Sequence, residues 1–329
     1  MSQTIQLLGI SNAIVDILAH VEDDFLTRIG APPGSMILVD VDQAQEIYNM
    51  MGPATEMSGG SVASTVAGFA NLGGSAAYIG RVADDQLGSI FIHDMRSLGV
   101  DVRLPAETRG APTARCHVLI TPDGQRTMQT YLGACTELST TDISDVTVGT
   151  PEVMLLEGYL WDTPEGPAAA AMAMDIAARA GASVALSLSD SQCVLRHHEA
   201  FTNALASHAR IIFANEQEIM ALFSVGSFDE AVAKAAERDT LFVLTRSEKG
   251  SVIVNGSEQV VQRAQHVAKV VDTTGAGDAF TAAFLYGFTA GKSLRECAEL
   301  GTICATAVIQ QVGGRIEKGA LAAHIAAGR

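Results

Sequence analysis

Short apolar runs alternate with helical patterns along the second half of the chain, and this alternation restricts the possible folds more than any other feature. Strands are expected at residues 153–156, 183–188, 211–214 and 241–245, with helical stretches between them. Strands separated by helices are typical of βαβ units, in which a crossover helix joins two parallel strands. The sequence therefore predicts an α/β fold around a mostly parallel sheet.

Two parts of the N-terminal half depart from this pattern. Residues 12–20, 34–41, 114–121 and 126–132 are expected to be antiparallel strands, and the turn 122–125 joins the last two. That turn reads Pro-Asp-Gly-Gln, which favours a tight reversal of the chain. We expect these strands to form a small sheet that stands off the main domain.

The chain is long enough for one large core and a small accessory unit, because 48% of its 329 residues are hydrophobic. We assign residues 1–11, 46–110 and 136–329 to a large α/β domain. Residues 12–45 and 111–135 are assigned to a small β lid.

The charge of the chain restricts its partners. Asp and Glu number 37 against 21 Lys and Arg, and the net charge of −16 repels nucleic acid and anionic membranes. The five cysteines show no metal-ligand spacing, and the N-terminus lacks the pattern of a signal peptide. We therefore expect a cytoplasmic enzyme that acts on small molecules. The sequence does not decide between a monomer and a homodimer.

The heptapeptide Asp272–Asp278 carries the strongest chemical signal, and an apolar helical pattern follows it. Small residues before a helix let a ligand approach the backbone, and free amides at a helix start attract anions. The candidate anion hole consists of Gly275, Ala276 and Gly277. Asp278 could then accept the proton of an attacking hydroxyl while the amides stabilise a phosphoryl group in transfer. Alternatively, the glycines only shape a turn and Asp278 only caps the helix.

This heptapeptide resembles, residue for residue, the C-terminal signature of the PfkB, or ribokinase-like, family of carbohydrate and nucleoside kinases. The resemblance implies a three-layer α/β/α sandwich with a small β lid. It also implies ATP as co-substrate, in contact with Gly275 and Gly277, and Mg²⁺ as cofactor. The γ-phosphoryl group would pass to a substrate hydroxyl, and closure of the lid would exclude water.

Residues 9–16 resemble the Gly-x-Asn-x-x-x-Asp segment of the family, with one extra residue before Asn12. The resemblance implies that Asp16 accepts hydrogen bonds from two vicinal sugar hydroxyls, with Asn12 beside it. A turn residue at a strand end is the alternative for Asp16.

The segment that begins at Ser58 resembles the N-terminal signature of the family. By that resemblance Gly59 and Gly60 let a sugar ring lie against the backbone, and the same substrate site includes Ser61 and Ser64. Most relatives have asparagine where Ser64 stands, so we expect altered affinity rather than lost activity.

The nucleotide half of the family pattern is also similar. Asn215 and Glu218 fit its Asn-x-x-Glu motif, which the resemblance links to phosphate and, through water, to Mg²⁺. A helix cap and a solvated acid are the alternative. Thr245, Arg246 and Gly250 lie in a segment similar to the loop beside ATP, and an ordinary solvated turn is the alternative.

Three further residues have weaker family counterparts. Arg126 resembles an arginine that some adenosine kinases bring onto the transferring phosphate, and a surface cation in a turn is the alternative. Asp272 and Thr274 are similar to residues that help to bind a monovalent cation, K⁺, in several relatives. Asp272 could equally hold its loop through backbone hydrogen bonds.

The acceptor is expected to be adenosine. The Gly-Gly-Ser form at 59–61, the arrangement of residues 12–16 and the segment Phe213–Glu216 look closer to adenosine kinases than to ribokinases. The alternatives are a kinase for ribose, fructose or 2-keto-3-deoxygluconate, or a catalytically silent nucleoside-binding sensor. A sugar acid would need a basic pocket residue, which the sequence does not single out.

An adenine ring also needs a flat apolar slot. Tyr159 and Trp161, with Leu132 or Met128 from the lid, are candidates to line it. Core packing explains these side chains equally well.

Overall fold

The computed structural model describes residues 5–104, 106–311 and 313–315, which form two β-sheets with helices packed on them. In order across the larger, nine-stranded sheet the strands are β14 (Glu258–Gln262), β13 (Ser251–Asn255), β12 (Leu241–Thr245), β11 (Ala209–Asn215), β10 (Ser183–Ser187), β9 (Val153–Glu157), β1 (Leu7–Ile10), β5 (Ala76–Ile79) and β6 (Asp101–Val102). All neighbours from β12 to β6 are parallel, and only β13 and β14 at one edge are antiparallel. The predicted mostly parallel sheet is confirmed.

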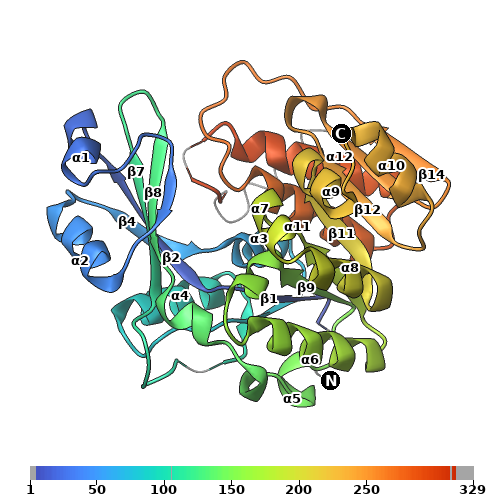
Figure 1. Ribbon diagram of the computed structural model, residues 1–329, viewed down its shortest axis with the longest axis horizontal. Coiled ribbons are helices and arrows are strands. Elements are labelled where there is room, and N and C mark those ends of the chain that lie inside the picture. The colour runs from blue at the N-terminus through green and yellow to red at the C-terminus, as the bar shows by residue number, and fades with distance from the viewer. Residues whose placement is uncertain (1–4, 105, 312, 316–329) are drawn as a thin grey trace.

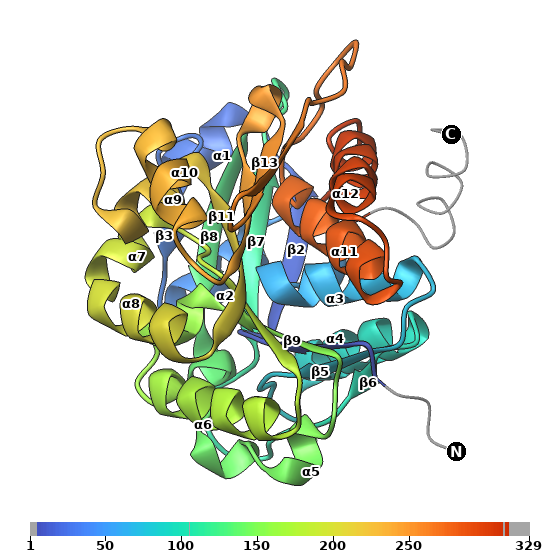
Figure 2. The ribbon, with the colours of Figure 1, turned by 90° about the vertical axis from the view of Figure 1, so that its right-hand side faces the viewer.

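Helices cover both faces of this sheet, which gives three layers (Figure 2). One face carries α3 (Ser61–Asn71), α4 (Gln86–Ser97), α11 (Ala276–Thr289) and α12 (Leu294–Val308). The other carries α5 (Asp145–Val148), α6 (Gly166–Arg179), α7 (Ser191–Arg196), α8 (His198–Ser207), α9 (Glu216–Phe223) and α10 (Phe228–Ala236). Every residue of β9 is buried because helices cover both faces of this central strand, and its first four residues are accordingly apolar.

The smaller, five-stranded sheet stands beside the larger one (Figure 1). In order its strands are β3 (Met36–Leu38), β8 (Arg126–Tyr131), β7 (Ala114–Ile120), β2 (Ile14–His20) and β4 (Thr55–Gly59). The β7–β8 hairpin is antiparallel as expected, but β2 pairs with β7, and β3 with β8, in parallel. The chain makes a long excursion through the larger sheet between β2 and β7, so a hairpin pattern does not predict their direction.

Among the described residues, helices pack on one face of the smaller sheet, and the other face, called the uncovered face below, carries no helix. The helices α1 (Asp23–Arg28) and α2 (Val41–Met50) bury Phe25, Leu26 and Ile47 against it, on the side away from the larger sheet (Figure 1). The uncovered face therefore looks toward the larger sheet.

The two sheets do not follow the expected domain boundaries throughout. Residues 46–110 are expected in the larger unit, whereas β4 within that range pairs with β2 of the smaller sheet. Residues 1–4 and 316–329, also expected in the larger unit, lie outside the described residues. In the part of the chain that the structure describes, no helix is long and apolar enough to cross a membrane.

Candidate active site

Four strands of the larger sheet end in polar residues at the same edge. Glu157, Ser187, Asn215 and Thr245 are the last residues of β9, β10, β11 and β12. Ligands of open α/β sheets bind beyond the carboxyl ends of the strands. A cavity of about 140 Å³ lies there, and three of these residues line it together with Asp278 from the first turn of α11. The fold thus brings Asn215 and Thr245, which were expected on the nucleotide side, and the expected base Asp278 to one cavity.

The loop before α11 has the shape of an anion site. Gly275 precedes the helix with a φ of +72°, and a Cβ at this position would lie 2.5 Å from the carbonyl oxygen of Gly314. Among the described residues, no protein acceptor is bonded to the amides of Gly275, Gly277 and Asp278. The amide of Ala276 differs from the expectation, because it donates to Thr273 O at 3.2 Å and closes the turn. Three free amides therefore remain at the positive end of the helix dipole.

Asp278 is half-buried, and its carboxylate accepts a hydrogen bond of 2.6 Å from Ser61 Oγ at the start of α3. Burial raises the pKa of Asp278 to about 6, while the Ser61 hydrogen bond and the charge of Arg315 act in the opposite direction. A carboxylate with a pKa near neutrality is suited to accept a proton from an alcohol in transfer.

Asp16 lies on the uncovered face of the smaller sheet, and its carboxylate packs against Gly59 of the neighbouring strand β4. Any Cβ at Gly59 would overlap this carboxylate, so glycine is required there. Burial raises the pKa of Asp16 to about 6, against the lowering effect of Arg315 and Arg126. Gly60 has a φ of +92° and a Cβ there would lie 2.6 Å from Asn12 O, so both glycines bring the chain close to the Asn12–Asp16 segment.

Glu157 is a buried acid that sequence analysis missed. Its Oε2 accepts the Asn12 amide at 2.9 Å, and backbone amides of Ser61 and Val62 also lower its pKa. Burial nevertheless raises the pKa of Glu157 to about 7. Its sequence signal was an acid directly after the apolar run 153–156, at the carboxyl end of a predicted strand. Asn12 is 4% exposed, and its Oδ1 has no partner among the described residues.

Asn215 and Glu218 form a capping box at the start of α9. Asn215 Oδ1 accepts the Glu218 amide at 2.9 Å, and Glu218 accepts the Asn215 amide and side-chain nitrogen at 2.9 and 2.5 Å. Both line the cavity with Asp278. Glu218 is 6% exposed and burial raises its pKa to about 7. The capping alternative from the sequence is thus present, on the wall of the cavity.

The segment after β12 contributes unevenly. Thr245 lines the cavity, and Gly250, with a φ of +88°, closes the turn that leads into β13. Arg246 does not line it: its guanidinium contacts Glu216 at 3.0 and 3.2 Å and lies 3.9 Å above the ring of Phe228. The cation expected beside ATP is therefore held against α9 and α10.

Arg126 of the smaller sheet forms an ion pair with Asp272, across the gap between the two sheets. The Asp272 carboxylate also accepts the amides of Thr274 at 3.0 Å and Gly313 at 2.9 Å. Asp272 thus holds its loop through backbone hydrogen bonds, which was the alternative to a monovalent cation site at Asp272 and Thr274.

Two other expected side chains lie away from the cavity. Trp161, on the 3-10 turn η3 (Gly158–Asp162), is 6% exposed and packs on Phe201 with ring centroids 5.0 Å apart, so it is a core residue. Ser64 lines a separate small hollow behind α3, together with Gly314 and Arg315. Tyr159 remains half-buried on η3, and burial raises its pKa.

An apolar patch surrounds Asp16 on the uncovered face of the smaller sheet. Its members are Ile14, Leu18, Cys116, Val118, Ile120 and Met128. Met128 was expected to line an apolar slot, whereas the other members were not singled out. Their signal was the alternation along β2 and β7 of residues that α1 and α2 do not cover.

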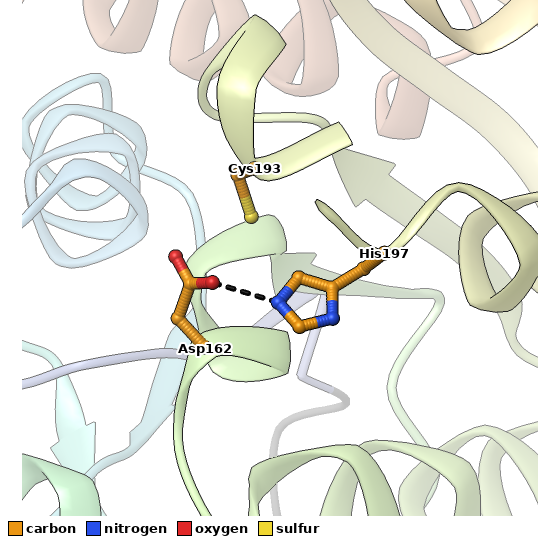
Figure 3. Close-up of side chains that lie close together, drawn as sticks. All are labelled: Asp162, Cys193 and His197. Atoms are coloured by element: carbon orange, nitrogen blue, oxygen red, sulfur yellow. Dashed lines mark hydrogen bonds and ion pairs between the residues drawn. The ribbon is translucent and has the colours of Figure 1, made fainter. Parts of the chain in front are cut away.

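Outside the cavity, Asp162, Cys193 and His197 bring a carboxylate, a thiol and an imidazole together (Figure 3). These are metal-ligand types, but each already has a protein partner. Asp162 accepts two hydrogen bonds from Arg196, at 2.6 and 3.1 Å, and contacts His197 Nε2 at 2.7 Å. The Cys193 thiol donates to Gly158 O at 3.4 Å. The cluster therefore joins η3 to α7, and we assign no metal to it.

A wider hollow of about 500 Å³ lies beside Arg81 and Glu107. Arg81 is paired there with Glu107 at 2.8 Å and Asp142 at 2.5 Å. None of the described residues that line this hollow lies at a helix start, so the cavity at the strand ends is the better site.

The comparisons with known proteins agree with this geometry. Residues 34–318 match the family described as pfkB family carbohydrate kinase. The chain belongs to this family. It is 46% identical to the adenosine kinase from Sinorhizobium meliloti, with a TM-score of 0.89 over 98% of this chain and 100% of that one. It is 43% identical to a probable sugar kinase from Rhizobium etli CFN 42, with a TM-score of 0.90 over 98% of both chains.

A more distant relative has another acceptor in its name. The 5-dehydro-2-deoxygluconokinase of Bacillus velezensis (strain DSM 23117 / BGSC 10A6 / LMG 26770 / FZB42) is 26% identical over 77% of this chain and 79% of its own length. The expected ribokinase-like fold and PfkB membership are confirmed. The protein is a kinase, and its family implies ATP as co-substrate and usually Mg²⁺.

Proposed function

We propose that this PfkB kinase transfers the γ-phosphoryl group of ATP to the 5′-hydroxyl of adenosine, giving AMP and ADP. The observation that carries the proposal is that Asp278 and the free amides of Gly275 and Gly277 share one helix start at the edge of one cavity. A base beside an anion site is the combination that phosphoryl transfer to an alcohol requires.

In this reaction the 5′-hydroxyl gives its proton to the Asp278 carboxylate. The hydroxyl oxygen bonds to the γ-phosphorus, and the bond between the γ-phosphorus and the bridging oxygen of ADP breaks. The amides at the start of α11 stabilise the negative charge on the phosphoryl oxygens. Ser61 orients the base through its 2.6 Å hydrogen bond.

The sugar of the acceptor lies against Asp16 of β2, beside the end of the paired strand β4. Asp16 accepts hydrogen bonds from the two vicinal hydroxyls, since one carboxylate can accept from both. Asn12 Oδ1 is buried and has no partner among the described residues, so it could accept a further hydroxyl donor. Gly59 and Gly60 let the end of β4 approach the Asn12–Asp16 segment closely, which holds both side chains in place. We assign no substrate contact to Ser64, because it lines a different hollow.

The nucleotide lies along Asn215, Thr245 and Gly250. Both carboxylate oxygens of Glu218 accept hydrogen bonds from Asn215, and among the described residues Glu218 pairs with no Lys or Arg, so it fits a Mg²⁺ contact through water rather than a direct one. Asn215 and Glu218 would hold the ion through water, and when bound it supplies positive charge for the phosphate oxygens. We assign no monovalent cation to the Asp272 carboxylate, because protein donors already occupy it.

The smaller sheet acts as a lid. Its Arg126 pairs with Asp272 in the loop before α11, so an ion pair joins the lid to the loop of the anion site. The apolar patch around Asp16 would then cover the acceptor and exclude water.

One feature favours a nucleoside over a simple sugar, and another favours it over a sugar acid. The apolar patch suits a flat base, which ribose and fructose lack. A sugar acid needs a free cation, but the two arginines whose charges act on Asp16 are already paired, Arg126 with Asp272 and Arg315 with Asp94. The match to a probable sugar kinase and to a 5-dehydro-2-deoxygluconokinase keeps a sugar kinase as the second candidate.

A coupled assay of ADP release tests the acceptor. Adenosine, ribose, fructose and 2-keto-3-deoxygluconate are offered with Mg²⁺ and ATP, and adenosine should give the highest kcat/KM by at least about 10²-fold, because a lost set of polar and apolar contacts costs several kcal/mol. Preferential turnover of any sugar would refute adenosine as the acceptor. Tight adenosine binding without turnover of any compound would support the silent sensor instead.

A further inference from the structure

Arg315 is a buried cation next to the candidate active site that neither the family signatures nor the proposed mechanism uses. It follows α12 near the end of the described residues, and its side chain is 12% exposed. Its Nη1 donates to Ser58 Oγ at 2.5 Å and contacts Asp94 Oδ2 at 3.1 Å. Its Nε has no partner among the described residues. Burying a guanidinium costs free energy unless its charge is used, so its position requires an explanation.

The contacts of the Arg315 side chain connect it to the base, Asp278. Asp94 on α4 accepts both the amide of Ser58, at 3.0 Å, and its hydroxyl. Ser58 lies three residues before Ser61, whose hydroxyl donates to Asp278. Arg315 and Asp94 therefore hold Ser58 near the end of β4. Ser61, just after this strand end, carries the hydroxyl that orients Asp278.

The backbone segment that carries Arg315 contacts the loop of the anion site. The carbonyl of Ile309 accepts the amides of Val271 and Asp272, at 2.8 and 3.3 Å. The amide of Gly313 donates to the Asp272 carboxylate, and Gly314 packs against Gly275. The segment that carries Arg315 is thus attached to the loop before α11, so Arg315 links the two loops that form the site.

The titratable groups around Arg315 come from four elements. They are Asp94 on α4, Asp16 on β2, Asp278 on α11 and Tyr78 on β5. Arg315 lowers the pKa of both Asp16 and Asp278 against the effect of burial. Asp278 also faces the Ser61 hydroxyl and the carboxylates of Asp16 and Glu157, whereas Asp16 also faces Arg126.

From this geometry we propose that Arg315 is a positioning residue for phosphoryl transfer, which holds the Ser58–Ser61 strand end against Asp278 and places its positive charge on the side of the two acceptor-side carboxylates, Asp16 and Asp278. Arg315 does not line the cavity that holds Asp278. The inference rests on the proposed function for its catalytic meaning, but the charge effect on the two carboxylates is a property of the protein alone.

The test is a ¹³C NMR titration of the aspartate carboxyl carbons in the ligand-free protein, with Asp278→Asn and Asp16→Asn to assign the resonances. Arg315→Met should move the titration of Asp278 and Asp16 to higher pH by about one unit, the usual effect of losing a nearby opposite charge. Arg315→Lys should restore most of the shift. Unchanged titration of both carboxylates in Arg315→Met would overturn the proposal.

A second variant protects the test against misfolding. Removing Arg315 alone leaves Asp94 without its cation, so the double variant Arg315→Met with Asp94→Asn removes both charges of the pair. The double variant should fold, and its Asp278 and Asp16 carboxyls should still titrate at higher pH than in the wild type. Arg103→Met is the matched control, because Arg103 is also largely buried but binds the carbonyls of Thr147 and Val148.

Kinetics then separate this inference from the choice of acceptor. For whichever acceptor is turned over, the acid limb of kcat/KM should move to higher pH in Arg315→Met and stay in place in Arg103→Met. If no acceptor is turned over, the proposed function fails while the titration still decides the role of Arg315. If the NMR titration of Asp278 and Asp16 moves in Arg315→Met but the acid limb of kcat/KM does not, the role of Arg315 in phosphoryl transfer is refuted.

Discussion

Asp278 combines two opposing requirements in one side chain. Burial favours its protonated form, but a base must be ionised to accept a proton. Ser61 and Arg315 oppose the effect of burial and leave the pKa at about 6. Asp16 has the same balance, again with its pKa at about 6. Burial thus makes the charged form of both carboxylates less favourable than it is in water.

This has a measurable effect on stability. For Asp278 the pKa of the folded state, about 6, lies above the ordinary value of 3.8, so the folded state binds more protons between these values. Its contribution to stability is therefore fully present below pH about 4 and is lost as the pH rises through 6. Asp278→Asn has no such loss, so relative to wild type it should gain up to about 3 kcal/mol between pH 4 and pH 7.

Urea unfolding of the ligand-free protein at several pH values and constant ionic strength measures this difference. Glu248→Gln is the control, because Glu248 lies in an exposed turn and should leave the pH dependence unchanged. Parallel stability curves for wild type and Asp278→Asn would contradict a raised pKa at Asp278.

At the scale of single residues, sequence reasoning found those whose chemistry depends on local context. Asp278 and Asn215 each lie at a helix start within a recognisable motif, and both line the cavity. Arg315 was missed because its partners, Ser58 and Asp94, are more than 200 residues away in the chain. For Trp161 the sequence does not decide between slot and core, because its contact with Phe201 depends on how η3 packs on α8.

At the scale of elements, the loop before α11 depends on the segment after α12. Gly275 has a φ of +72° and touches the backbone of Gly314. Gly291, just after α11, has the same φ of +72°, but a Cβ at that position would meet no atom within 4 Å. The two glycines therefore separate backbone strain from close packing.

Alanine at each position tests this distinction. Gly291→Ala should cost only the left-handed backbone, about 1–2 kcal/mol of unfolding free energy, and keep kcat. Gly275→Ala must in addition displace Gly314, so it should lose more stability and lower kcat by at least about 10-fold, because small displacements of an anion site weaken transition-state stabilisation. Equal effects of the two substitutions on kcat and stability would show that the contact with Gly314 does not position the loop.

Elements of the larger sheet were predictable because each crossover is local. The strands β9, β10, β11 and β12 follow one another in both sequence and space, so the alternation of strand and helix contains their order. The smaller sheet was not predictable in the same way. Its strands β2 and β7 are neighbours in space but far apart in the chain, and only the β7–β8 hairpin is local.

At the scale of the whole molecule, an acidic protein is proposed to bind an acidic nucleotide. The net charge of −16 opposes this binding, so attraction must be local. The free amides at the start of α11 are such a local source, and the Arg126 side chain lies next to their loop through Asp272. This ion pair joins the smaller sheet to the loop that carries the anion site.

The central claim is that Asp278 removes the proton of the acceptor hydroxyl in front of this anion site. The most direct test is the steady-state kinetics of Asp278→Asn with Mg²⁺, ATP and adenosine, beside a check of its fold by circular dichroism. The account predicts that kcat falls by at least about 10² while the fold is intact, because the amide keeps the shape of the carboxylate but cannot act as the base. Wild-type kcat in a folded Asp278→Asn protein would contradict it.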